Sequence, residues 1–189
     1  MSAQFHVAET ELLASLVGQL LDLVHGDMDD SPVRPPEDPL AAAIGFSFAD
    51  RPTDPVLLRL FPDGYQDDDE AAADFRRFTE TSLRETKSNA AATVLASLAT
   101  AEGARPDGDA DAEVTQGEKI RIDLDKEQAT AWLRTLTDLR LALGTRLGVE
   151  EGDEEHWGKL PSDDPRRHVH DVYDWLGWVQ ETLVRALSL

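Results

Sequence analysis

The sequence contains no cysteine among its 189 residues. Disulfide bonds, thiol nucleophiles and zinc or iron–sulfur sites built on cysteine are therefore excluded. Positive charge is also scarce, since 18 Lys and Arg stand against 38 Asp and Glu and leave a formal net charge of −20. Such a field repels phosphate backbones and anionic lipid surfaces, so we expect no nucleic-acid partner and no membrane partner.

Long apolar runs and common catalytic motifs are missing as well. No stretch approaches the roughly 20 apolar residues that span a bilayer, and the start, MSAQFHVAETELL, has no basic segment followed by an apolar run. We find no His-Glu-x-x-His, Gly-x-Ser-x-Gly or Ser-x-x-Lys pattern and no glycine-rich phosphate loop. We therefore expect a cytoplasmic protein with no cofactor and no metal, and we favour a binding protein over an enzyme.

Helical periodicity dominates what is present. Residues 9–25 place leucines and valines on one stripe, which Gly26 can end. Residues 68–101 indicate one long helix, or two joined near Lys87. The apolar face expected for this segment consists of Phe75, Phe78, Leu83, Ala90, Val94 and Leu98. Two further helices are expected, from Lys126 to about Leu147 and from Pro165 to the C-terminus.

Local signals mark where helices begin and end. Asp-Pro pairs at 38–39, 54–55 and 164–165 suit helix starts, because Asp accepts bonds from free first-turn amides and Pro tolerates the first helical position. Asp125 and Gln128 form a capping-box pattern. Gly148 is a natural stop for the same helix.

A short strand signal completes the fold prediction. Ile120, Ile122 and Leu124 alternate as in a half-buried strand, and residues 5–7 are its candidate partner. The sequence predicts a mainly α fold, a single-domain helical bundle with a small two-stranded β ribbon. The domain spans residues 1–189, with mobile acidic loops near 26–38, 103–117 and 150–164.

The segment DGDADAEVTQGE, residues 107–118, has the ligand spacing of an EF-hand calcium loop. Asp107, Asp109, Asp111 and Glu118 occupy ligand positions, but Ala112 stands where the sharp turn needs glycine. A strand also follows where a helix should. A solvated acidic loop is therefore the favoured interpretation. His168 and His170 diverge on a helix and cannot share a metal.

Two arginines on the helix from Lys126 are candidate ligand-binding residues. Arg140 and Arg146 fall in or at the edge of its apolar stripe, where a guanidinium needs a carboxylate or a route to water. They could hold an anionic ligand or a partner's carboxylate. The favoured alternative is that they snorkel to solvent or pair with an internal acid such as Asp174. Arg134 and Asp138 are expected to form a surface pair on the opposite face.

Two tryptophans near the C-terminus have different expected roles. Trp175 flanks the apolar stripe of the last helix and is predicted to be core. Trp178 lies among charged residues on the polar side of that helix. It either packs beneath a loop, which we favour, or serves as an exposed anchor for a partner.

Three segments resemble a known family: TDPVLLRLFPDGYQDD, DLRLALGTRLGV and YDWLGWVQETLVRAL, in this order. They are similar to an actinobacterial domain-of-unknown-function family, and the resemblance runs from about Phe5 to Leu187. Members of that family are often encoded beside the adaptor of the Clp protease. The resemblance implies a helical domain with no established activity and a hint of regulated proteolysis.

The leading hypothesis is an acidic, non-enzymatic helical module that acts by protein–protein contact, with a link to Clp proteolysis. Its tentative binding residues are Trp178, Arg140, Arg146 and Asp174. The partner is an unknown protein, and a homo-oligomer is left open. The alternative is a small-molecule binder or enzyme whose anionic ligand is held by Arg140 and Arg146.

Overall fold

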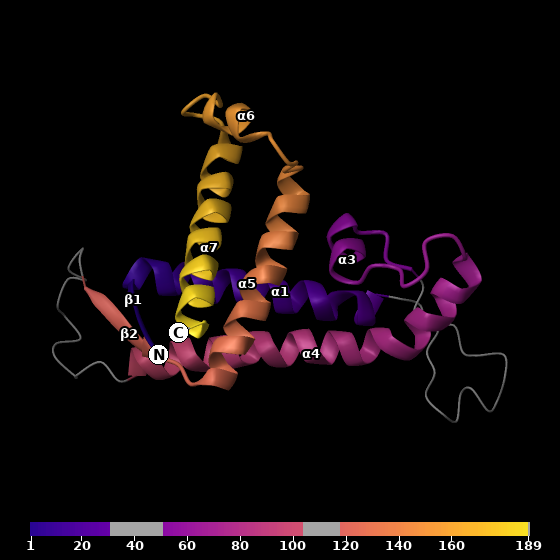
Figure 1. Cartoon of the computed structure of the whole chain (residues 1–189), viewed down its shortest axis with the longest axis horizontal. Coiled ribbons are helices and arrows are strands. Elements are labelled where there is room, and N and C mark those ends of the chain that lie inside the picture. The colour runs from indigo at the N-terminus through magenta and orange to yellow at the C-terminus, as the bar shows by residue number, and fades with distance from the viewer. Residues whose placement is uncertain (31–50, 104–117, 189) are drawn as a thin grey trace.

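A computed structural model describes residues 1–30, 51–103 and 118–188 of the chain. Helix α1 (Val7–Asp30) and helix α4 (Asp69–Gly103) lie side by side as one layer. Helices α5 (Lys126–Leu147) and α7 (Pro165–Leu187) form an upright pair that stands across this layer (Figure 1). Within these ranges, no helix combines the length and the apolar character needed to cross a bilayer. The prediction of a mainly α fold is confirmed.

The predicted ribbon is also present. Strands β1 (Ser2–His6) and β2 (Lys119–Asp123) pair antiparallel, with Phe5 opposite Ile120. The pairing confirms the alternation seen in residues 119–124, although β1 begins earlier than the expected segment 5–7. Phe5, Ile120 and Ile122 turn inward and join the core.

The long helices differ from expectation at their ends. Helix α1 does not stop at Gly26 but continues to Asp30, and α4 is one uninterrupted helix. A single glycine costs a helix only about 1 kcal/mol, so packing against α4 can carry α1 through Gly26. The expected acidic loops near 26–38 and 103–117 fall largely outside the described residues.

Helix starts follow the capping chemistry read from the sequence. Asp54 accepts a 2.7 Å bond from the Val56 amide at the start of α3 (Pro55–Leu60), and Asp164 accepts one of 2.9 Å from the Arg166 amide at the start of α7. The third Asp-Pro pair lies outside the described residues.

Helix α5 begins and ends as predicted. Both bonds of the capping box between Asp125 and Gln128 are formed. Gly148 closes the helix in the left-handed conformation, with φ of 74°. The segment 150–164 contains a short helix, α6 (Glu154–Gly158), whose Trp157 is buried.

The apolar face predicted for α4 is wrong in its first half. Phe75, Phe78 and Leu83 are exposed there, whereas Ala90, Val94 and Leu98 are buried as expected. The side of the first half that faces the protein carries the charged residues Arg76, Glu80 and Arg84. Their spacing of four places them on one stripe, so α4 is rotated to bury charge.

Glu80 is the centre of this buried charge cluster. One carboxylate oxygen accepts a 2.8 Å bond from Arg76, and the other accepts a 2.7 Å bond from Arg84. Arg76 also donates to Asp63 at 2.6 Å, and Arg84 donates to the carbonyl of Val24 on α1. Because every charge has partners, the desolvation cost of burial is offset.

A second buried pair links α4 to α5. The Lys87 ammonium donates a 2.6 Å bond to Asp138, which is only 6% exposed. Burial raises the pKa of Asp138, and the Lys87 ammonium partly opposes that shift. The expected surface pair with Arg134 is therefore wrong, because Asp138 faces α4 rather than solvent.

Replacing Glu80 by alanine is expected to lower the free energy of unfolding by about 3–5 kcal/mol, since two buried guanidiniums lose a shared carboxylate. Urea unfolding followed by circular dichroism measures this. Glu85→Ala, at an exposed position of the same helix, is the control and should change stability by less than about 0.5 kcal/mol. Equal effects of the two substitutions would contradict a structural role for the cluster.

Candidate functional site

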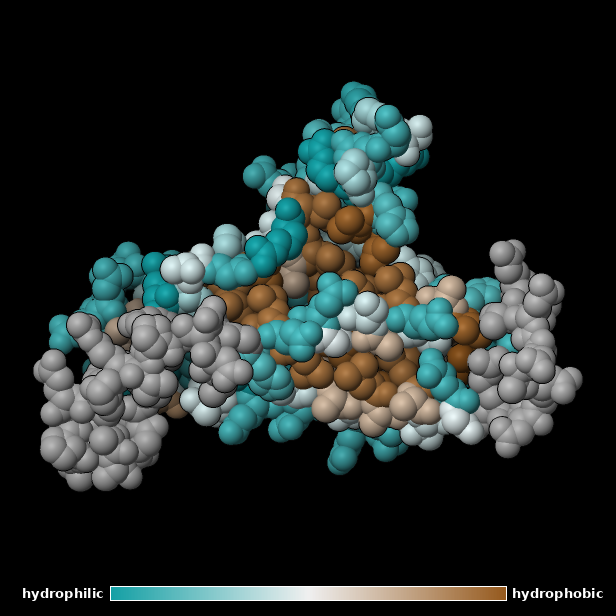
Figure 2. Space-filling view, turned by 180° about the vertical axis from the view of Figure 1, so that it is seen from behind, coloured by the Kyte–Doolittle hydropathy of each residue, from teal (hydrophilic) through white to brown (hydrophobic). Residues whose placement is uncertain are grey.

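An apolar groove runs between strand β1 and helix α7, and we call it the β1–α7 groove. It has a volume of about 280 Å³. On the face shown in Figure 2, hydrophobic side chains gather where the upright helix pair meets the α1–α4 layer. The residues that line the groove come from both ends of the chain and from the start of α5: Met1, Ser2, Ala3, Gln4, Phe5, Leu124, Trp132, Trp178, Val179, Thr182, Leu183 and Ala186.

Trp178 forms part of one wall of this groove and is 62% exposed. The favoured prediction, that it packs beneath a loop, is therefore wrong. It stands three positions after Trp175 on α7, which is partly buried against the core. The large apolar ring of Trp178 is thus held at the surface by a helix whose other side is anchored.

The floor of the groove is built from buried side chains. The rings of Phe5 and Trp132 stack with centroids 5.9 Å apart and an angle of 25°. Trp132 is 2% exposed, and its indole nitrogen is buried without an acceptor in the part of the chain that is described. Buried donors without acceptors are rare in folded proteins. The floor is thus buried and apolar, and it contains one unsatisfied donor.

The sequence singled out Trp178 but missed the rest of the groove. Leucines and valines near it on α7 signal a core stripe, and residues 2–4 carry no pattern beyond an extended segment. The pairing of β1 with β2, together with the packing of the helices, places the chain start beside α7. Stripes on separate elements do not show which elements are adjacent, so the groove had no sequence signal.

Arg140 has neutral partners rather than Asp174. Its guanidinium donates to the amide oxygen of Gln180 at 3.0 Å and to the hydroxyl of Tyr173 at 3.2 Å. It also lies over the Tyr173 ring at 4.8 Å from the centroid, an arrangement favoured by the charge distribution of the ring. A Cβ on Gly177 would lie 3.4 Å from the guanidinium carbon, so this glycine leaves room for the arginine to lie across α7.

Arg146 has a different partner from those of Arg140. It forms a 2.6 Å ion pair with Asp54, the residue that caps α3, and this pair lowers the pKa of Asp54 although burial opposes it. Neither arginine lines the β1–α7 groove. A shared site for an anionic ligand on these two residues stays a prediction.

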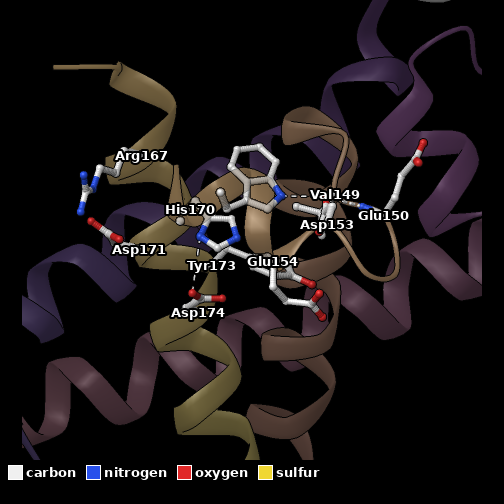
Figure 3. A pocket seen from close by; sticks show the side chains of 11 residues that line it. Val149, Glu150, Asp153, Glu154, Arg167, His170, Asp171, Tyr173 and Asp174 are labelled. Carbon is white, nitrogen blue, oxygen red and sulfur yellow. Dashed lines mark hydrogen bonds and ion pairs between the residues drawn. The ribbon is translucent and has the colours of Figure 1, made fainter. Parts of the chain in front are cut away.

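Asp174 belongs to a second depression, the α6–α7 cleft, which has a volume of about 450 Å³. There the imidazole of His170 stacks on the indole of Trp157 with centroids 4.6 Å apart, and Asp174 lies 3.4 Å from His170 Nδ1 (Figure 3). The Trp157 indole donates a 2.7 Å bond to Asp153. The stack therefore fastens α6 to α7.

Most of the charged side chains that line the cleft are acidic. The Glu150 amide and the Trp157 indole both donate to Asp153, and these bonds lower the pKa of its carboxyl. Glu150, Glu154 and Asp171 also line the cleft, with Arg167 as a cation among them. No group of three or more metal-ligating side chains is found in the described residues. The calcium-loop segment from Asp107 lies outside them up to residue 117.

A family model described as Domain of unknown function (DUF2017) matches residues 1–187. The Putative oxidative stress regulator AosR of Mycobacterium leprae (strain TN) is 33% identical over 192 residues, covering 95% of this chain and 78% of that protein. The Oxidative stress regulator AosR of Mycobacterium tuberculosis (strain ATCC 25618 / H37Rv) is 32% identical over 194 residues, with the same coverage of 95% and 78%. No solved structure matches the chain significantly.

The two tryptophans of the groove should respond differently to truncation. Trp132→Ala removes a buried ring and is expected to lower the free energy of unfolding by about 3–5 kcal/mol. Trp178→Ala removes an exposed ring and should lower it by less than about 1 kcal/mol. Thermal and urea unfolding of the two variants measure the difference. A loss at Trp178 as large as that at Trp132 would show that the exposed ring is structural.

Proposed function

The chain belongs to the DUF2017 family, a family without an assigned activity, and on that premise we propose that it is a regulatory protein that acts by binding a partner protein in the β1–α7 groove. The observation that carries the proposal is the exposed Trp178 beside an apolar floor. Tryptophan is among the residues that contribute most to protein–protein binding, because its ring buries a large area on contact.

The chemistry of the groove supports binding rather than catalysis. Its polar side chains are those of Ser2, Gln4 and Thr182, and the Met1 ammonium, which also belongs to a lining residue, is bonded to the Leu124 carbonyl. General acid–base catalysis needs a group whose pKa lies near the operating pH, and none of these side chains supplies one. The groove is therefore better suited to hold apolar side chains of a partner.

The mycobacterial relatives are named as oxidative stress regulators, and this supports a role in the response to oxidative stress. At 32–33% identity over nearly the whole chain, we propose that this protein acts in the same kind of response. The printed chain has no cysteine, so it holds no thiol that could be oxidised to a disulfide or a sulfenic acid. The proposed regulator would receive the oxidative signal through its partner.

Two hypotheses from the sequence, the link to Clp proteolysis and the binding of an anionic ligand, remain as secondary proposals. The link to Clp proteolysis stays a prediction, which the identity of the partner would decide. The anionic-ligand alternative is favoured only at Arg140, whose described contacts are with neutral groups. Arg146 already has Asp54 as its partner.

The proposal is tested by affinity capture from the native host with three forms of the protein. Wild type and Val184→Ala are expected to capture the same protein, which mass spectrometry identifies. Trp178→Ala is expected to capture at least about tenfold less of that protein. Val184 is the matched control, because it is also exposed on α7 but does not line the groove. Capture of the same proteins by all three forms would refute a groove-bound partner.

The role in stress is tested by genetic complementation. A deletion strain carrying Trp178→Ala should resemble the empty strain in its survival of hydrogen peroxide, and one carrying Val184→Ala should resemble wild type. Protein levels are checked by immunoblotting. Full rescue by Trp178→Ala at equal abundance would show that the groove is not required for the response to oxidative stress.

A further inference from the structure

We propose that the partner enters the β1–α7 groove as an extended strand that pairs with the free edge of β1. The occupant is a segment with apolar residues at alternate positions and basic residues at its ends. This inference rests on the proposed function, because it requires that the groove holds a partner. It adds how the partner binds and which chemistry the groove selects.

The ladder of the ribbon shows which backbone groups of β1 are available. Met1 and Leu124 exchange two bonds, with the Met1 nitrogen donating at 2.6 Å and the Leu124 amide donating back at 2.8 Å. In an antiparallel pair, such bonded positions alternate with positions that point away from the neighbouring strand. The register then turns the backbone groups of Ser2 and Gln4 away from β2.

The end of the strand agrees with this alternation. The His6 amide is the next outward group, and it donates a 2.6 Å bond to the Glu9 carboxylate of α1. Glu9 thereby closes one end of the edge. The N–H and C=O groups of Ser2 and Gln4 remain as two outward pairs, the pattern that an added strand recognises.

The residues of this open edge line the groove. All five residues from Met1 to Phe5 line it, and Trp178, Thr182 and Ala186 stand on the side of α7. A strand laid along β1 would point every second side chain toward the floor of Trp132 and Leu183. The groove volume of about 280 Å³ is enough for a few side chains. It is small for a whole helix, because a helix with its side chains is about 10 Å wide.

Trp132, which lines the same groove, also carries the unsatisfied indole donor. An extended peptide presents carbonyl oxygens at regular intervals along its length. A small adjustment of the floor on binding would let one of them accept from the indole. An occupant made only of apolar side chains would leave this nitrogen without a partner.

Charge selects the ends of the occupant. The chain carries a formal net charge of −20. Arg121 of β2 and Arg185 of α7 do not line the groove, and they are already paired, with Asp123 and Glu181. A segment with lysine or arginine at its ends is therefore attracted, and an acidic one is repelled. The same charge opposes the pairing of two copies of this chain.

The first experiment selects peptides from a random 12-residue phage library on the immobilised full chain, with removal of phage that bind Trp178→Ala. The enriched peptides are expected to alternate apolar and polar residues and to be net basic. Enrichment of acidic peptides, of peptides with apolar residues at helical spacing, or of no peptide at all would overturn the strand proposal.

The second experiment uses the most enriched peptide, made synthetically, as the probe. Gln4→Pro removes an outward amide without removing a ribbon bond, and proline is tolerated on edge strands. Gln4→Ala keeps the amide and is the matched control. By calorimetry, Gln4→Pro should weaken peptide binding about tenfold or more, and Gln4→Ala by less than about twofold. Equal affinities would overturn strand pairing.

Amide hydrogen exchange in the wild-type protein provides a readout that needs no substitution. The peptide should slow exchange of the Ser2 and Gln4 amides and leave that of Ala3, already in the ribbon, nearly unchanged. Absence of added protection at both positions would overturn the pairing even if Gln4→Pro fails to fold.

The two proposals fail in distinguishable ways. If the cellular partner is lost by Trp178→Ala but kept by Gln4→Pro, the groove binds a partner and the strand mode is wrong. If Trp178→Ala keeps the partner, the proposed function itself fails. Analytical ultracentrifugation tests the remaining occupant, since a dimer that Gln4→Pro dissociates would identify a second copy and overturn the proposal.

Discussion

The rotation of helix α4 is the constraint on which the rest of the structure depends. Glu80 holds Arg76 and Arg84 on the protein-facing side of the helix, and the two arginines reach α1 and the end of α3 through backbone carbonyls. Hydrogen bonds to charged groups have strict geometry, so they define one angular setting where apolar packing alone would tolerate several. Lys87 then fixes α5 through Asp138. The buried charges of α4 therefore determine where the upright helix pair stands, and with it where the groove lies.

Local chemistry made much of the fold predictable. The capping bonds of Asp54, Asp125 and Asp164 form between residues a few positions apart, so the sequence contains both partners. The strand alternation of residues 119–124 was readable for the same reason. The rotation of α4 was not, because a helical pattern of aromatic residues normally indicates burial. The outcome depended on Asp63 and on the carbonyl of Val24, which are distant in sequence.

The candidate site follows the same division. Trp178 could be placed on the polar face of its helix from the sequence, but its exposure depends on what lies opposite. Strand β1 and helix α7 come from the two ends of the chain, and their approach is set by the packing of α5 on α4 and of α7 on α5. The Trp157–His170 stack likewise joins α7 to α6, in a segment that the sequence predicted to be a loop. Side chains that meet across elements leave little periodic signal in either one.

The burial of charge in α4 has a thermal consequence. The heat capacity change of unfolding grows with the apolar surface exposed and falls with the polar surface exposed. Half of the longest helix in the described residues turns guanidiniums and a carboxylate inward and keeps Phe75 and Phe78 in water already in the folded state. We therefore expect a smaller heat capacity change than the length of the chain suggests, and a flatter curve of stability against temperature. Warming also lessens the desolvation penalty of buried ion pairs, so the cluster around Glu80 should lose less of its contribution on heating than an apolar core of equal size.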